Sequence, residues 1–100
     1  MALEMVVGVN VVDDKAYEEY RQLMLPILKS YDGDFGYDFK VSEVLKSSSE
    51  HPINRVFIIY FSNKEAMNAF FSNPEYLKIK QMYFEKSVTA TTIIATYERG

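Results

Sequence analysis

Cysteine is absent from this chain of 100 residues. Its absence excludes disulfide bonds, thiolate metal sites and cysteine nucleophiles together. The first residues, Met1–Met5, also lack the basic segment and the long apolar segment of a secretory signal. Both observations agree with a reducing compartment, so we expect a cytoplasmic protein.

An excess of positive charge is missing as well. The formal net charge is -3 at pH 7, and the acidic and basic residues are interspersed. Binding to nucleic acid or to an anionic membrane requires a basic patch. No apolar run approaches the length that crosses a bilayer. We therefore predict no nucleic-acid partner and no membrane partner.

Histidine occurs once, as His51, directly before Pro52 in the polar segment 46–52. A metal or haem site needs several converging ligands. One histidine and scattered serines also supply no nucleophile with a base and an orienting group. We predict no metal, no cofactor and no recognisable catalytic constellation, and we expect 46–52 to be a mobile surface loop.

The residues that are present indicate one well-filled domain over residues 1–100, since 48% are hydrophobic and 15% are aromatic. Two predicted strands, Leu3–Val12 and Arg55–Phe61, are apolar at both alternating positions, which is typical of strands buried on both faces. The segment Phe35–Leu45 alternates instead, which predicts a half-buried edge strand. Its apolar parity holds Tyr37, Phe39, Val41 and Glu43, and its polar parity holds Asp38, Lys40 and Ser42. A last strand is predicted over Val88–Tyr97.

Helical spacing follows the first strand. Asp13 stands at the N-cap, and a buried stripe follows. Its members are Tyr17, Tyr20, Met24, Ile27, Leu28 and Tyr31. Pro26 is expected to kink or loosen this helix, and Gly33 to be its left-handed terminating residue.

A second helical region follows the strand Arg55–Phe61. Ser62 or Asn63 is expected to cap a helix that begins at Lys64. Pro74 disfavours helical geometry at Asn73, so Ser72 or Asn73 ends that helix and begins another, which we predict to run from Pro74 to Glu85.

The predicted order β-α-β-β-α-β is typical of an α+β, ferredoxin-like sandwich. Right-handed crossovers would place both helices on one face of a four-stranded antiparallel sheet, with the first and third strands in the centre. The other face would expose a large apolar area, which predicts a homodimer through that face. Either Phe57, Ile59 and Phe61 or Val56, Ile58 and Tyr60 would meet the partner, and the alternation does not choose between them.

Several short motifs together resemble the DUF1330 family of the dimeric α/β-barrel superfamily. They are Asp13-x-x-x-Tyr17-x-x-Tyr20, Tyr31-x-Gly33, Arg55-x-x-x-Ile59-x-Phe61 and Asn73-Pro74-Glu75-Tyr76. The resemblance extends over about Val6 to Tyr97 and implies a ferredoxin-like subunit whose sheet packs on that of its twin as a dimeric α/β barrel. The family is named for its unknown function, so it assigns no catalytic residue.

Four residues are candidates for ligand binding: Arg55, Tyr17, Tyr76 and Glu43. Arg55 could clamp a carboxylate or enolate, although an ordinary ion pair with Glu43, Asp34 or Glu50 explains it more simply. The tyrosines could supply hydroxyls to a pocket, although their helical spacing also suits core residues.

Two functions remain open from the sequence. The first is binding of a small apolar or aromatic ligand, with cofactor-free monooxygenase or isomerase chemistry by analogy with superfamily relatives. The alternative is a non-enzymatic dimerisation or interaction module without a ligand. An internal pocket with a polar group at its base would favour the first function, and a filled interior would favour the second.

Overall fold

The computed structural model describes residues 2–99; Met1 and Gly100, the end residues of the expected domain 1–100, lie outside the described part. Its strands are β1 (Ala2–Val11), β2 (Asp34–Lys40), β3 (Arg55–Phe61) and β4 (Val88–Arg99). Its helices are α1 (Asp14–Ser30), α2 (Lys64–Ser72), α3 (Pro74–Ile79), the π-helical turn η1 (Lys80–Phe84) and α4 (Glu85–Ser87).

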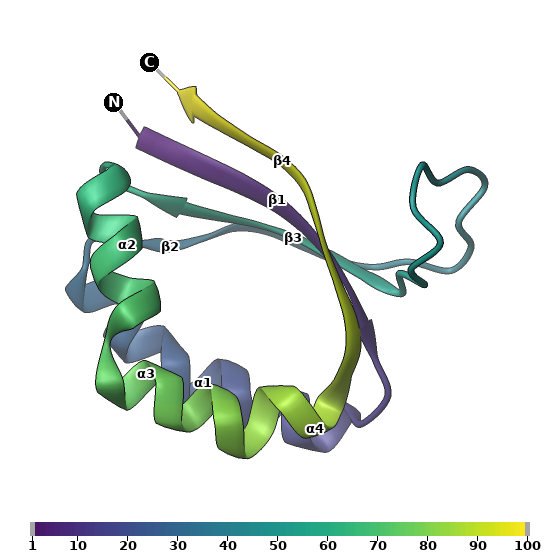
Figure 1. Ribbon diagram of the computed structural model, residues 1–100, viewed down its shortest axis with the longest axis horizontal. Helices are drawn as coiled ribbons and strands as arrows, with labels where there is room; N and C mark the ends of the chain where they lie inside the picture. Colours follow the sequence, from purple (N-terminus) through teal and green to yellow (C-terminus); the bar gives the residue numbers. More distant parts are fainter. Residues whose placement is uncertain (1, 100) are drawn as a thin grey trace.

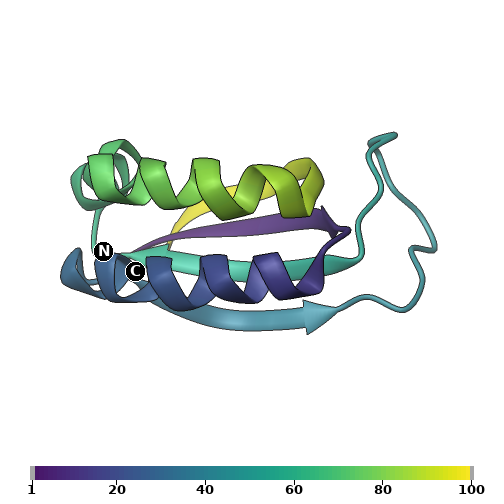
Figure 2. The same ribbon diagram turned by 90° about the horizontal axis from the view of Figure 1, so that it is seen from below.

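The strands form one curved antiparallel sheet in the order β2-β3-β1-β4 (Figure 1). All the helices cover the same face of this sheet, as two adjacent rows that run in opposite directions (Figure 2). One row is α1, and the other is α2 to α4. The predicted ferredoxin-like fold, with β1 and β3 in the centre, is therefore confirmed.

Cross-strand register shows which side chains share each face of the sheet, because directly opposed residues point the same way. One row toward the helices is Phe57 beside Val7 beside Ile93. One row on the opposite face joins all four strands through Tyr37, Ile58, Val6 and Ala95. We call this opposite face the bare face, because no helix covers it (Figure 1).

The register also shows which residues of β3 face the helices and which lie on the bare face. Ile59 and Phe61 are buried in the core cluster under the helices, and Phe57 packs against that cluster. Val56, Ile58 and Tyr60 are therefore the residues on the bare face, where each is only half-buried. These are the residues that a partner sheet would contact.

Strand β2 lies at the sheet edge as predicted, but it ends at Lys40 rather than at Leu45. The apolar side of its alternation, which includes Tyr37 and Phe39, is exposed rather than buried. A bulge at Gly36 shifts the register between Phe35 and Tyr37. Phe35 consequently faces the helices, while Tyr37 and Phe39 lie on the bare face with exposed fractions of 58% and 53%. An extra residue in one strand turns the following side chains over.

Helix α1 begins as predicted, because the Asp13 carboxylate accepts a hydrogen bond from the Ala16 N–H. It runs as one α-helix through Pro26 to Ser30, so the proline does not end it. Pro26 is exposed, and the ring removes only one backbone donor from the helix.

The end of α1 differs from the prediction in which residue takes the left-handed conformation. Asp32 has φ 61°, whereas Gly33 does not have positive φ. The Gly33 and Asp32 N–H groups donate to the carbonyls of Leu28 and Lys29, which is the Schellman arrangement. Aspartate tolerates this conformation better than most residues. Gly33 is needed for space instead, since a Cβ would lie 2.5 Å from Leu28 Cδ1 and 2.9 Å from the Tyr60 carbonyl oxygen.

The second helical row begins at Asn63, whose side chain accepts from the Ala66 N–H. Of the two residues expected at the next junction, Asn73 ends α2 and caps α3, since its side-chain oxygen accepts from the Tyr76 N–H. The row does not continue as the single α-helix expected over Pro74–Glu85. It widens into the turn η1, where the Glu85 N–H donates to the Lys80 carbonyl five residues earlier.

The connection between β2 and β3 projects from the end of the sheet (Figure 1). It spans residues 41–54 without a helix or strand and contains the predicted loop 46–52. His51 is exposed within it. None of the helices formed by residues 2–99 has the length and apolar character that a bilayer crossing requires.

Replacing Gly33 with alanine should destabilise the fold by about 1–3 kcal/mol, because the new methyl group would overlap a backbone carbonyl that cannot rotate away. The measurement is the free energy of unfolding from urea denaturation. Gly36→Ala is the matched control, since its Cβ would find its nearest neighbours at 3.8 Å. Equal stability losses in the two variants would contradict this explanation.

Candidate ligand-binding site

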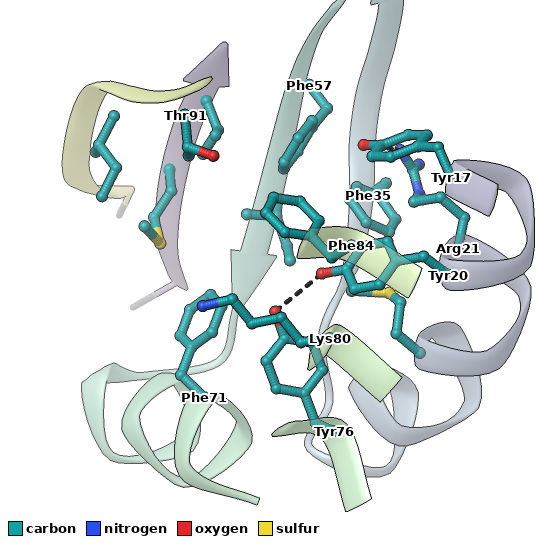
Figure 3. Close-up of a pocket in the computed structure, with 15 residues that line it drawn as sticks. Tyr17, Tyr20, Arg21, Phe35, Phe57, Phe71, Tyr76, Lys80, Phe84 and Thr91 are labelled. Carbon is teal, nitrogen blue, oxygen red and sulfur yellow. Dashed lines mark hydrogen bonds between the residues drawn. The ribbon is translucent and has the colours of Figure 1, made fainter. Parts of the chain in front are cut away.

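A pocket of about 250 Å³ lies between the sheet and the two helical rows (Figure 3). Its walls are mostly apolar and aromatic side chains from all four strands, from α1 and from the second helical row. The lining residues are Met5, Val7, Tyr17, Tyr20, Arg21, Met24, Phe35, Phe57, Ile59, Phe71, Tyr76, Lys80, Phe84, Thr91 and Ile93.

Two tyrosine hydroxyls meet in this pocket. Tyr20 Oη and Tyr76 Oη are 2.9 Å apart, and this hydrogen bond joins α1 to α3 (Figure 3). Burial raises the pKa of Tyr20 well above its usual value, and the neighbouring Tyr76 adds to the effect. Burial likewise raises the pKa of Tyr76. Both phenols are therefore protonated at neutral pH, and the pair can offer a ligand a donor and an acceptor but no negative charge.

An ion cluster lies beside the pocket, where α1 meets β2 and β3. Asp38 accepts two hydrogen bonds from Arg55, at 3.1 and 2.9 Å, and also pairs with Arg21 Nη2 at 3.0 Å. The Arg21 Nη1 group donates to the Tyr17 hydroxyl at 3.3 Å. Two guanidinium groups thus share one carboxylate, which leaves one positive charge in excess.

The cluster holds Asp38 in its charged form. Burial acts to raise the pKa of Asp38, but hydrogen bonds and positive charge from Arg55 and Arg21 outweigh it, so the pKa lies below its usual value. For Tyr17, burial raises the pKa despite the nearby arginines. The guanidinium carbon of Arg21 also lies 3.6 Å from the ring centre of Phe35, in a cation–π contact.

The structure brings together three of the four candidates that the sequence suggested. Tyr17 and Tyr76 both line the pocket. Arg55 lies behind Tyr17, with its guanidinium carbon 4.7 Å from that ring centre, and it does not line the pocket. Its guanidinium is occupied by Asp38, so the ion-pair interpretation was right in kind but named the wrong carboxylates. Glu43 is exposed in the loop 41–54 and belongs to no part of the pocket.

Sequence reasoning did not identify Asp38 as the ion-pair partner of Arg55, or Arg21 as the second arginine of the cluster. Asp38 was assigned to the polar side of an edge strand, but the Gly36 bulge turns it toward the helices, diagonal to Arg55. Arg21 follows the buried Tyr17 by four residues, and this helical spacing was the one signal that could have placed it beside that tyrosine.

Phe84 was also missed, because of the backbone, and Lys80 was missed as a pocket residue although its spacing from Tyr76 is that of a regular α-helix. Lys80 and Phe84 follow Tyr76 by four and eight residues, and all three line the pocket. In an α-helix each four-residue step advances about 40° beyond a full turn, so Phe84 would drift away from the face of Tyr76. The wider turn η1 offsets this drift and brings the Phe84 ring to 4.9 Å from that of Tyr20.

The arrangement suits an apolar or aromatic molecule better than a metal ion. Among residues 2–99, no group of three or more histidine, cysteine or acidic residues converges in a way that could hold a metal. The pocket offers aromatic faces, phenolic hydroxyls and two cationic side chains. Such a combination can bind, orient and hydrogen-bond a small organic ligand.

The chain is a ferredoxin-like α+β domain with a pocket between its sheet and its helices. The family model described as "Domain of unknown function (DUF1330)" matches residues 5–97, and the chain belongs to that family. The resemblance found in the sequence is thereby confirmed. Among curated proteins, none matches this chain.

Solved structures of low sequence identity share the fold. A protein of unknown function from Rhodopseudomonas palustris has a TM-score of 0.80 at 15% identity, covering 98% of this chain and 82% of its own. A DABB family protein with a ferredoxin-like fold from Mesorhizobium loti has a TM-score of 0.67 at 12% identity, covering 98% and 96%. A mutant of SnoaB, a cofactor-independent oxygenase from Streptomyces nogalater, has a TM-score of 0.66 at 13% identity, covering 98% and 92%.

Replacing Asp38 with asparagine should cost about 1–2 kcal/mol at neutral pH, because it leaves two partly buried guanidinium groups without their shared counter-ion. The folded pKa of Asp38 is lowered, so its contribution is complete above the unfolded value of about 3.9 and is lost as the pH falls through the folded value. Urea denaturation at several pH values should therefore show a shallower acid decline for Asp38→Asn than for the parent.

Glu43→Gln is the matched control for this titration. Glu43 is exposed in the loop, and within residues 2–99 no ion pair engages it. Its removal should leave the acid decline unchanged. A decline that is equally steep with and without Asp38 would rule out the cluster as its source.

Proposed function

We propose that this protein binds a small, largely apolar or aromatic organic ligand in the pocket between its sheet and helices. The observation that supports this most directly is the pocket itself, an unfilled space with the Tyr20–Tyr76 hydroxyl pair among otherwise apolar walls. An interaction module without a ligand would gain stability from filling this space, because interiors normally pack without large voids.

The dimensions of the pocket limit the ligand. Its volume of about 250 Å³ is slightly below the range of roughly 300–1,000 Å³ that is usual for sites of drug-sized molecules. A compound of one or two fused rings matches this space. Aromatic walls such as Phe35, Phe57 and Phe84 favour a flat ring that can stack or meet them edge-on.

We further propose that the protein converts such a ligand by cofactor-free oxygenase or isomerase chemistry. Its support is the fold shared with SnoaB, which is analogy alone. Chemistry of this kind needs a group that removes a proton. The described lining residues include no carboxylate and no histidine, and Tyr20 and Tyr76 hold their protons. We therefore place binding first and turnover second.

We also propose that the protein forms a homodimer through the bare face. Half-buried Val56 and Ile58 lie there beside exposed Tyr37 and Phe39, in continuous cross-strand rows. An apolar surface spread over four strands is larger than soluble monomers usually leave uncovered. A twofold copy of the same face would bury it, because a self-complementary patch favours a closed pair.

Ligand binding can be tested with 2-naphthamide, a neutral two-ring probe. We expect a dissociation constant of about 10–1,000 μM by calorimetry, as ligand efficiency allows for a molecule of this size. Thr91→Trp should weaken binding at least tenfold, because Thr91 is an exposed lining residue and an indole there would occupy the pocket.

Gln81→Trp is the control for an added surface indole, since Gln81 is exposed and does not line the pocket. It should bind the probe like the parent. Absence of binding to the parent, or equal loss in both variants, would refute a site in this pocket.

The dimer can be tested by placing a charge at the centre of the bare face. Ile58→Lys should convert the dimer to a monomer at micromolar concentration, because a buried lysine without a partner opposes association. Sedimentation velocity measures the change. Leu45→Lys is the control, since Leu45 is 88% exposed in the loop. A parent chain that sediments as a monomer would refute the proposed homodimer.

A further inference from the structure

The charge of the pocket is opposite to that of the protein. The chain carries a formal net charge of -3, yet the described lining residues include Arg21 and Lys80 and no acidic residue. Low-dielectric walls strengthen the field of such charges inside a cleft. A pocket of this kind favours an anion over a neutral molecule of the same shape.

Arg21 is poorly placed to bind that anion directly. One of its terminal nitrogens pairs with Asp38, the other donates to Tyr17, and the ring of Phe35 covers its face. Its guanidinium is therefore largely committed to the ion cluster, and it contributes positive potential rather than a free hydrogen-bond donor.

Lys80 is placed differently. It follows Tyr76 by four residues, a spacing that places both on the same helix face, and it is half-buried at the pocket. Figure 3 shows its side chain extending over the pocket. Within residues 2–99, no ion pair or side-chain hydrogen bond engages its amine, in contrast to Arg21 and Arg55. An ammonium group held over an apolar pocket without a carboxylate is suited to a ligand anion.

We propose that the ligand is a small aromatic carboxylate whose ring enters the pocket and whose carboxylate pairs with Lys80. This inference rests on the proposed function, since it requires that the pocket binds a ligand at all. The aromatic walls would hold the ring, and the Tyr20–Tyr76 pair would remain available for a polar ring substituent. Lys80 acts here as a positioning and specificity-determining residue.

The test compares 2-naphthoate with 2-naphthamide, which share a ring system and differ in charge. Calorimetry at low ionic strength should show that the parent binds the carboxylate about fivefold or more tightly than the amide. Lys80→Gln should abolish this preference while leaving the affinity for the amide nearly unchanged, and Lys80→Arg should restore most of it. Added salt should reduce the preference in the parent.

Lys78→Gln is the matched control, because Lys78 is exposed on the same helical row and does not line the pocket. It should keep the full preference. Thermal unfolding of each variant without ligand verifies that Lys80→Gln folds like the parent.

The possible results separate this inference from the proposed function. Equal affinities of the parent for both compounds would overturn the role of Lys80. A preference that survives Lys80→Gln, or that disappears in Lys78→Gln, would overturn it as well. Each of these results leaves the pocket as a binding site. Failure of both compounds to bind would overturn the proposed function and this inference together.

Discussion

The architecture depends on two central strands that are apolar on both faces. Burial of one face of β1 and β3 under the helices leaves Val6, Val56 and Ile58 on the other, which the helices of residues 2–99 do not cover. The hydrophobic effect acts equally on both faces. In a single subunit of this fold, helices therefore cover only one of the two apolar faces of the central strands.

On each face of the sheet, arginine pairs with a carboxylate that a strand supplies. On the bare face, the nearly buried Glu4 carboxylate accepts hydrogen bonds from Arg99 and Tyr97. Under the helices, Asp38 is shared by Arg21 and Arg55. A charge removed from water persists only when it is paired and hydrogen-bonded. Each cluster joins elements that are distant in sequence, so both help to specify how the strands and α1 fit together.

Local sequence signals predicted the element order, the cap at Asp13, the helix junction at Pro74 and the two-sided strands, because these features depend on neighbouring residues. The face taken by Asp38 could not be predicted in this way. It depends on a bulge at Gly36, and glycine in a strand has several structural meanings. The position of Phe84 in the pocket was hidden for a related reason, since the hydrogen bonding of a π-helical turn has no distinct side-chain signature.

The turn η1 also has an evolutionary meaning. A π-helical turn accommodates about one residue more than the α-helical turn it replaces. Loss of one residue from 80–84 would let the row continue as a regular helix, and the Phe84 side chain would then follow Tyr76 by seven residues. Seven residues are close to two full α-helical turns, so the aromatic side chain would stay on the face of Tyr76. A single-codon deletion could thus remove the wider turn while this wall of the pocket and the sheet stayed in place.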